Sequence, residues 1–396
     1  MKILTISVTP YNINRSAKMN ATILKYLKSL GHEVSSMVYN HDVLWFAPSE
    51  DGRFYYEDSG KVVCELYPFD YKGANSSPAA YELVRLTQPD VVITIGDYNE
   101  TDFFHAVKML NQDKFKWINI LTIDSLPISK SRESAFSYPD VMITTTREAK
   151  EAIEKVTNTK NVYFLPFGPD TSIFQGEKVE SSKFSIISCM KNTIYANWYA
   201  LLSGVSLAQK TYSDIELYLH VNISDRGFYD IKELIEQFDV KVRLPEKYIG
   251  HNDGLTDEEL RQEYLKADMI VDVSMQSATG LSALEGMSCG CIPSFSNIGA
   301  FKEICGELKL GAIISSDNFI CNDLGEMCNI VSASEVCKDI ILYYDMKKRE
   351  IEKFNAIKEG MINLSKKYDV IYFNEGLKEI IENLNNINKE FVLESF

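Results

Sequence analysis

The chain has 396 residues, 45% of them hydrophobic, and its 56 acidic residues against 41 Lys and Arg residues give a formal net charge of −15. A chain of this length and composition forms two domains with buried cores, so disorder is excluded as its main state. The negative charge opposes attraction to phosphate backbones and disfavours nucleic acid as a bulk partner. No run resembles a transmembrane segment or a secretory leader, so we expect a cytoplasmic protein, and peripheral membrane contact has no support.

Short apolar runs alternate with helical segments along the first part of the chain. The predicted strands are rich in β-branched residues and lie at residues 2–8, 32–39, 90–95, 117–123, 141–144 and 162–165. A helix is predicted at residues 17–30. This alternation is typical of a parallel sheet covered by helices on both faces. We therefore expect a Rossmann-like N-terminal domain at residues 1–168.

An aromatic segment at residues 45–56 interrupts this alternation. It begins with Trp45 and Phe46 and ends with the three aromatic residues Phe54, Tyr55 and Tyr56. One interpretation is an acceptor-recognition surface, because exposed aromatic rings stack on sugars and other flat apolar groups. The other is a two-stranded excursion whose aromatic side chains are buried.

The second half of the chain repeats the strand and helix pattern after a polar connection. Gly, Pro, Ser and charged residues at 169–183 indicate a linker. The following strands are predicted at residues 184–188, 215–220, 240–244, 269–273 and 292–295. We assign residues 184–367 to a second Rossmann-like domain. The spacing of apolar residues at 368–384 predicts a C-terminal helix within the last segment, 368–396.

Motifs for several other functions are missing from the sequence. The eight cysteines lack paired zinc-ligand spacing, and buried thiols are the better interpretation of Cys289 and Cys291. No Asp-x-Asp pair is present. No strand is followed by Gly-x-Gly-x-x-Gly, and no Gly-x-Ser-x-Gly occurs. A dehydrogenase and a hydrolase with a catalytic triad therefore have no support.

The most informative segment is residues 277–294, which reads SATGLSALEGMSCGCIPS. A buried strand leads into a glycine-containing turn, and a helix predicted at residues 281–288 places Glu285 one turn inside its start. Backbone N–H groups around Gly280 and Leu281 would face a diphosphate at the helix N-terminus. The Glu285 carboxylate can accept hydrogen bonds from both ribose hydroxyls. The segment therefore predicts a nucleotide-sugar site, and the alternative is an ordinary strand, turn and helix.

This segment resembles the donor-site signature of family-4-type retaining glycosyltransferases (glycosyltransferase group 1), which have the GT-B fold. In that signature two Glu residues are separated by seven others, with Gly-Leu between them and Gly-x-Pro after the helix. Four residues fall on the pattern, namely Gly280, Leu281, Glu285 and Gly290. Pro293 comes one residue late, and Ser277 occupies the position of the first Glu, which in the family often contacts the transferred sugar.

The resemblance covers most of the chain. Further matches are GHEV at 31–34, PDVVIT at 89–94 and PFGPDTSIF at 166–174, and Tyr264, Ala267 and Asp268 match the helix and strand before the donor signature. The resemblance implies an α/β protein with two doubly wound Rossmann-like domains facing a cleft. It also implies that the C-terminal helix crosses back to the N-terminal domain.

Two cationic positions of the family differ in this chain. Lys191 falls where the family commonly has a phosphate-binding Arg, and Ala196 occupies the position of a second cation five residues later. Lys191 is consequently expected to be the main side-chain cation on the donor diphosphate. The loop after the first strand lacks the glycine pair often found there. Arg15 can contact a ligand in its place or be solvated.

The resemblance implies a retaining, hexosyltransferase-like enzyme that moves a sugar from a nucleoside-diphosphate sugar to an unidentified acceptor. The donor-binding residues would be Lys191, Asn192, Ser277, Thr279, Gly280, Leu281 and Glu285. The catalytic candidates are Asp124, Lys191 and Asp97, and the acceptor-side candidates are Trp45, Phe46 and Arg15. Both Asp residues follow predicted strand ends, and the alternative for Asp124 is a turn-initiating or capping role.

We expect no metal and no cofactor other than the donor substrate, because the sequence has neither an Asp-x-Asp pair nor a His and Cys cluster at ligand spacing. Two other functions stay open. One is a GT-B protein that binds a nucleotide sugar or a partner with little or no transfer. The other is a GT-B nucleotide-sugar epimerase, which would need an acid and base pair that the sequence does not display.

Overall fold

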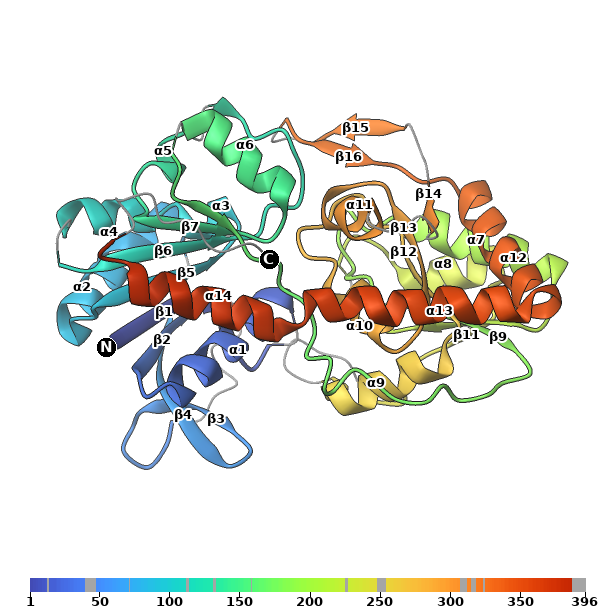
Figure 1. The fold of residues 1–396 in the computed structure, drawn as a ribbon, viewed down its shortest axis with the longest axis horizontal. Helices are drawn as coiled ribbons and strands as arrows, with labels where there is room; N and C mark the ends of the chain where they lie inside the picture. Colours follow the sequence, from blue (N-terminus) through green and yellow to red (C-terminus); the bar gives the residue numbers. More distant parts are fainter. Residues whose placement is uncertain are drawn as a thin grey trace. The chain divides into compact units, whose positions relative to one another are not determined.

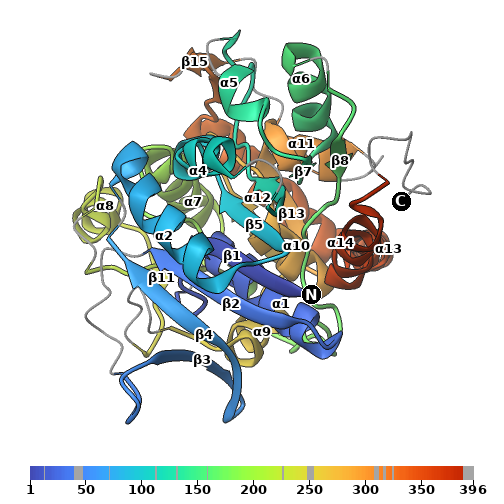
Figure 2. The same ribbon diagram turned by 90° about the vertical axis from the view of Figure 1, so that its left-hand side faces the viewer.

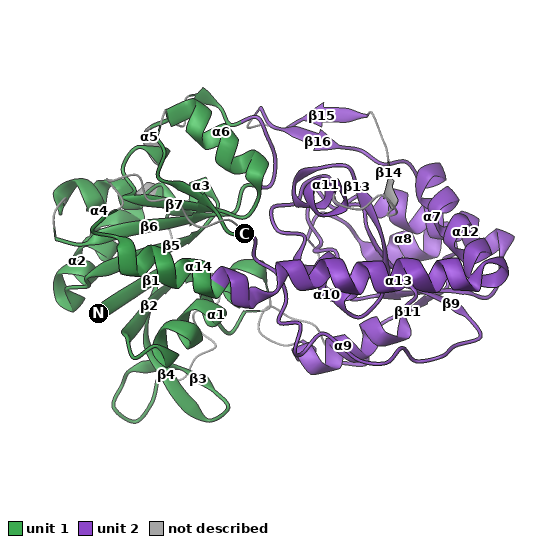
Figure 3. Cartoon of the chain, in the orientation of Figure 1, with its two compact units in different colours: residues 1–123, 128–165, 374–396 green, residues 124–127, 166–373 purple. Residues whose placement is uncertain are grey.

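The computed structural model (Figure 1) describes residues 1–386 except 13, 40–47, 71, 112–113, 131–132, 158, 225–226, 248–253, 307–311, 315–317 and 323–324. The chain divides into two compact units (Figure 3). Unit 1 comprises Met1–Ile123, Ile128–Leu165 and Asn374–Phe396, and unit 2 comprises Asp124–Pro127 and Pro166–Phe373. In the described part of the chain, no helix is both long and apolar enough to cross a membrane.

Unit 1 contains one eight-stranded sheet in the order β3-β4-β2-β1-β5-β6-β7-β8. Only β3 pairs antiparallel with its neighbour, and β3 and β8 form the two edges of the sheet (Figure 2). The strands are β1 (Lys2–Val8), β2 (Glu33–Tyr39), β3 (Phe54–Asp58), β4 (Lys61–Phe69), β5 (Val91–Gly96), β6 (Lys116–Leu121), β7 (Val141–Thr144) and β8 (Val162–Phe164).

Helices cover both faces of this sheet. They are α1 (Arg15–Ser29), α2 (Ser77–Thr87), α3 (Tyr98–Thr101), α4 (Phe104–Leu110), α5 (Glu133–Phe136) and α6 (Arg147–Thr157), with a short 3₁₀ helix at Gly73–Ser76. The Thr5 hydroxyl donates to Asn20 of α1 at 2.9 Å on one face. Leu4 and Ile6 belong to an apolar cluster with Val84 of α2. Successive side chains of a strand alternate between faces, so burial on both sides explains the nearly continuous apolar runs.

Unit 2 contains a parallel six-stranded sheet in the order β11-β10-β9-β12-β13-β14 and a separate antiparallel hairpin. The strands of the sheet are β9 (Phe184–Ser188), β10 (Ile215–Leu219), β11 (Val242–Arg243), β12 (Met269–Asp272), β13 (Ile292–Ser296) and β14 (Ala312–Ile314). The hairpin consists of β15 (Phe319–Cys321) and β16 (Met327–Asn329).

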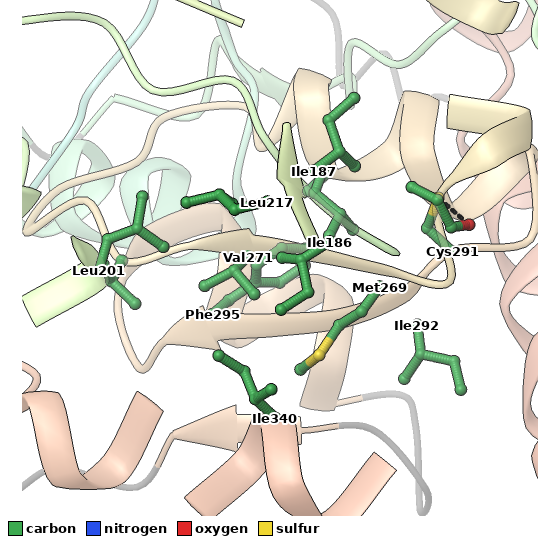
Figure 4. Close-up of a cluster of buried hydrophobic side chains, with 14 of the residues drawn as sticks. Ile186, Ile187, Leu201, Leu217, Met269, Val271, Cys291, Ile292, Phe295 and Ile340 are labelled. Atoms are coloured by element: carbon green, nitrogen blue, oxygen red, sulfur yellow. Dashed lines mark hydrogen bonds between the residues drawn. The ribbon is translucent and has the colours of Figure 1, made fainter. Parts of the chain in front are cut away.

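The helices of unit 2 enclose a buried apolar core on its sheet (Figure 4). They are α7 (Trp198–Thr211), α8 (Ile231–Phe238), α9 (Asp257–Lys266), α10 (Leu281–Ser288), α11 (Gly299–Gly306), α12 (Ala333–Arg349) and α13 (Ile351–Ser365), followed by a 3₁₀ turn at Lys366–Tyr368. Ile186 of β9, Val271 of β12 and Phe295 of β13 contribute to this core, as does Ile340 of α12. Capping boxes fix the starts of α9 and α12.

The last helix, α14 (Val370–Asn383), begins in unit 2, and its residues from Asn374 onward belong to unit 1. The Tyr26 hydroxyl of α1 donates to Glu375 at 2.8 Å. Gly168, directly before the predicted linker, lies so close to the 3₁₀ turn that precedes α14 that a Cβ on Gly168 would collide with the Tyr368 carbonyl oxygen. The domain boundaries drawn from the sequence stay a prediction.

The predicted fold class is confirmed, and the predicted strands of both sheets are present with ends shifted by at most two residues. The helix predicted at residues 281–288 coincides with α10. The sequence did not predict β14 or the β15–β16 hairpin. An antiparallel pair of strands, β3 and β4, begins at Phe54 within the aromatic segment 45–56 and extends beyond it, whereas residues 45–47 of that segment lie outside the described residues.

Candidate functional site

The donor-like segment, residues 277–294, follows the end of β12, where Asp272 is 6% exposed. Asp272 Oδ1 accepts hydrogen bonds from the backbone N–H and the hydroxyl of Ser274, at 3.0 and 2.6 Å. Ser282, in the first turn of α10, also hydrogen-bonds to this carboxyl group. Burial raises the pKa of Asp272, and these hydrogen bonds oppose the shift. Asp272 therefore ties the strand end to the start of the helix.

The loop around Ser277 is held by backbone hydrogen bonds on both sides. The Ser277 N–H donates to the Asp124 carbonyl oxygen at 3.1 Å, and the Ser277 carbonyl oxygen accepts from the Ala300 N–H at 2.8 Å. Gly299 has a φ of +50°, and a Cβ there would collide with the Ser277 carbonyl oxygen. Glycine is therefore required at the start of α11 for this close approach.

Helix α10 begins at Gly280, which adopts a left-handed conformation with a φ of 61°. No side chain at this N-cap position bonds to the first N–H groups of the helix. A Cβ on Gly280 would lie 2.7 Å from the Ile304 Cδ1 atom of α11. Thr279 is 5% exposed, whereas Leu281 is half-buried. The first turn of α10 thus presents backbone N–H donors, the groups that bind phosphate at helix N-termini.

Glu285 projects from the second turn of α10 and is 3% exposed. Its Oε2 atom accepts a hydrogen bond from the Tyr264 hydroxyl of α9 at 3.1 Å. The same hydroxyl lies 3.4 Å from the Cys189 Sγ atom. A buried carboxylate is costly unless it is hydrogen-bonded. The sequence predicted the place of Glu285 on the helix, but it did not predict the contact with Tyr264.

Lys191 and Asn192 follow the carboxyl end of β9. Lys191 is exposed. The Asn192 amide bonds to both backbone groups of Tyr229: Nδ2 donates to the Tyr229 carbonyl at 2.8 Å, and Oδ1 accepts from its N–H at 3.3 Å. Asn192 thus positions the loop next to Lys191, and its role in donor binding stays a prediction. Ala196 is buried.

Asp124 lies beside the donor-like segment. It falls within the segment 1–168 that the sequence assigned to the N-terminal domain, but Asp124–Pro127 belongs to unit 2. The backbone contact with Ser277 accounts for this assignment. Sequence patterns locate strand ends, but they do not show which neighbouring element a following loop contacts. The catalytic role of Asp124 stays a prediction.

Two of the other candidates, Asp97 and Arg15, lie in unit 1. Asp97 is the N-cap of α3 and forms a capping box with Glu100: Asp97 Oδ1 accepts from the Glu100 N–H at 2.8 Å, and Glu100 Oε2 accepts from the Asp97 N–H at 3.0 Å. Arg15 is the first residue of α1 and is half-buried. Trp45 and Phe46 lie outside the described residues. The catalytic role of Asp97 and the acceptor roles of these residues stay predictions.

Asp272 is a candidate that the sequence analysis missed. It lies at the end of a strand, as Asp97 and Asp124 do in the sequence prediction. The apolar residues on both sides of Asp272 make it look like part of the predicted strand at 269–273. All eight cysteines are free thiols. Among the described residues, no group of three or more His, Cys, Asp or Glu side chains is placed to hold a metal ion. Metal independence stays a prediction.

Solved structures similar to this chain span nearly its whole length. A glycosyltransferase from Rickettsia africae ESF-5 has a TM-score of 0.69 and 14% identity, covering 98% of this chain and 99% of that one. Sucrose-phosphate synthase from Thermosynechococcus elongatus has a TM-score of 0.73 and 13% identity, with coverages of 97% and 99%. Anabaena Alr3699/HepE, in complex with UDP and glucose, has a TM-score of 0.68 and 11% identity, covering 97% of this chain and 100% of that one. No protein-family model and no curated protein match the chain. These similarities show that the chain has the GT-B fold.

Proposed function

We propose that this GT-B protein is a retaining glycosyltransferase that moves a sugar from a nucleoside-diphosphate sugar to an acceptor. The observation that carries the proposal is the buried carboxylate of Glu285 on the helix whose N-terminus starts at the uncapped, left-handed Gly280. A carboxylate and a helix N-terminus on one short helix suit the ribose and the diphosphate of one nucleotide. The fold it shares with Anabaena HepE, which was solved with UDP and glucose, supports this assignment.

In the proposed reaction, the bond between the anomeric carbon and the diphosphate oxygen breaks, and a bond to the acceptor oxygen forms on the same face of the sugar. The proton of the acceptor hydroxyl passes to the departing diphosphate oxygen. The departing diphosphate gains negative charge. The N–H groups of the first turn of α10 and the Lys191 ammonium would stabilise that charge. No divalent metal is needed in this scheme.

The sugar end of the donor would lie near Ser277, because this residue belongs to the loop between β12 and the helix that receives the diphosphate. The Asp124 carbonyl oxygen accepts from the Ser277 N–H, so Asp124 is placed next to this loop. We assign Asp124 to the reacting sugar or acceptor on this basis. Asp97, Arg15, Trp45 and Phe46 are assigned to the acceptor side, and the protein is assigned to the cytoplasm, on the sequence argument alone.

A second candidate function is nucleotide-sugar binding without transfer. Ser277 stands where similar enzymes have a Glu, and the buried Ala196 stands where they have a second cation. Both differences remove charged groups from the reacting end of the donor while leaving Glu285 and the helix N-terminus in place. This candidate predicts binding without turnover.

The test is nucleotide binding and donor turnover measured on the same preparation. Calorimetry with UDP, GDP and ADP identifies the nucleotide. Release of that nucleotide from UDP-glucose, UDP-N-acetylglucosamine, GDP-mannose and ADP-glucose is then followed with and without simple sugar acceptors. Transfer or slow donor hydrolysis supports the enzyme, whereas binding without release supports the second candidate. Absence of binding to all three diphosphates contradicts both.

A further inference from the structure

The Tyr264 side chain is in direct contact with the Glu285 carboxylate. The Tyr264 side chain is fully buried, and its hydroxyl lies 3.1 Å from Glu285 Oε2. Its second neighbour is the Cys189 Sγ atom at 3.4 Å. Cys189 follows β9, Tyr264 belongs to α9 and Glu285 to α10, so the end of one strand and two helices of unit 2 meet at this hydroxyl.

The Tyr264 ring and backbone are held from several directions. The ring packs edge-to-face on Phe174, with 6.1 Å between the ring centroids. The Tyr264 carbonyl oxygen accepts hydrogen bonds from the Lys178 ammonium at 2.8 Å and from the Cys291 thiol at 3.2 Å. A side chain packed on all sides keeps one rotamer. The hydroxyl therefore stays at a fixed point relative to α10.

The direction of the hydrogen bond follows from the charges. Burial raises the pKa of Tyr264 well above its usual value of 10.0, and the nearby Cys189 and Glu285 add to the shift. Burial likewise raises the pKa of the Cys189 thiol. Tyr264 is thus a protonated donor with a single proton. A carboxylate is a much stronger acceptor than a thiol sulfur, so that proton goes to Glu285 Oε2.

We infer that Tyr264 is a positioning residue for the nucleotide ribose: its hydroxyl fixes one oxygen of the Glu285 carboxylate and so sets the plane in which that carboxylate meets the two ribose hydroxyls. This inference rests on the proposed function. Two hydrogen bonds to neighbouring ribose hydroxyls need a carboxylate of fixed orientation. The terminal torsion of a Glu carboxylate is broad, so the hydrogen bond from the Tyr264 hydroxyl narrows the orientations that the Glu285 carboxylate adopts.

The test compares Tyr264→Phe with Tyr344→Phe. The control removes the same oxygen from a tyrosine in the same unit whose hydroxyl bonds to Asp214 Oδ1 at 2.7 Å. The probes are the diphosphate among UDP, GDP and ADP that the parent protein binds best and its 2′,3′-dideoxy analogue. The readout is the affinity for the diphosphate divided by the affinity for its dideoxy analogue. Both affinities are measured by calorimetry below the melting temperature of each variant. A purely structural loss weakens both ligands together and leaves the ratio unchanged.

We expect Tyr264→Phe to lower this ratio about three- to tenfold, since a hydrogen bond to a charged group is involved. Tyr344→Phe should keep the parent ratio. Adding Tyr264→Phe to Glu285→Gln should cause little further change, because both act on the same contact. If Tyr264→Phe keeps the parent ratio while Glu285→Gln lowers it, this inference is overturned and the proposed function stays intact. A parent protein that binds none of the three diphosphates would overturn the proposed function, and this inference with it.

Discussion

At the scale of single residues, Glu285 and Asp272 show how two buried carboxyl groups in one segment differ. Glu285 accepts from a tyrosine of a neighbouring helix, whereas Asp272 accepts from serines close to it in the chain. The first arrangement leaves the carboxylate on a helix that begins at an uncapped N-terminus. The second joins a strand to that helix. We therefore expect Glu285 to govern ligand affinity and Asp272 to govern stability.

Glu285→Ala should weaken binding of the nucleoside diphosphate by about 1.5 to 3 kcal/mol, because it removes charge-assisted hydrogen bonds to the ribose. Calorimetry gives the affinity, and thermal unfolding checks the fold. Asp339→Asn is a suitable control, since this half-buried carboxyl group accepts a hydrogen bond from the Ser294 hydroxyl at 2.8 Å. Unchanged affinity in Glu285→Ala would show that the ribose lies elsewhere.

Lys191 should contribute to turnover more than to folding, because its side chain is exposed and Ala196 supplies no second cation. We expect Lys191→Ala to lower the rate of donor turnover about tenfold or more and Lys191→Arg to keep part of it. The rate of diphosphate release measures both. Parent rates in both variants would place the phosphate site on other residues.

Asp272 should make stability depend on pH. Its pKa is raised above the usual 3.8 by burial, so the folded state binds the proton more tightly than the unfolded state does. The stabilising contribution of protonated Asp272 is complete below that usual value and is lost as the pH rises through the raised pKa.

Asp272→Asn removes this titration. The free energy of unfolding of the parent, relative to that of the variant, should therefore fall as the pH rises from below 3.8 and passes through the raised pKa of Asp272. Urea unfolding across this range measures the difference, and the exposed Asp70→Asn is the control. A difference that rises with pH would contradict the assignment.

At the scale of elements, the short helices α10 and α11 depend on glycines at their first turns. Gly280 precedes α10 in a left-handed conformation, and Gly299 starts α11 against the Ser277 carbonyl. The loop between β12 and α10 is thus shaped by a residue that follows it by some twenty positions in the chain. The close approach of the Gly299 backbone to the Ser277 carbonyl fixes the position of Ser277.

Gly299→Ala should destabilise unit 2 by about 1 to 3 kcal/mol, because the new Cβ collides with the Ser277 carbonyl oxygen in a conformation that favours glycine. Gly306→Ala is the matched control on the same helix, since a Cβ there meets nothing within 4 Å. Urea unfolding measures both variants. Equal stability of the two would mean that the loop adapts without cost.

At the scale of the whole molecule, the GT-B fold is shared with solved structures at only 9 to 14% sequence identity. Many sequences satisfy the same core of parallel strands and covering helices, so the fold persists while the site residues change. Chemistry therefore has to be argued from the site.

If the proposed function is right, donor turnover should survive thorough chelation. The helix N-terminus and Lys191 can offset the charge of the departing diphosphate, and the sequence has no Asp-x-Asp pair. Activity in excess EDTA should stay within about twofold of the untreated rate, as measured by diphosphate release. Complete loss that magnesium or manganese restores would refute the metal-free scheme.

The sequence by itself determined the architecture and the site of the donor-like helix. Runs such as β5 and β9 are apolar because both faces of a parallel sheet are buried, and this is visible in the residues alone. The turn and helix from Gly280 to Glu285 are likewise formed by residues adjacent in the sequence, so their pattern could be recognised without the structure.

Only the tertiary structure decided which distant residues meet that helix. Tyr264 reaches Glu285 across 21 positions of the chain, and Asp124 bonds to Ser277, which is far beyond it in sequence. Such contacts depend on how strands and helices stack, and that stacking leaves no periodic signal in the residues involved. Periodicity reports which face of an element is buried, whereas the partner buried against it is set by the packing of the whole unit.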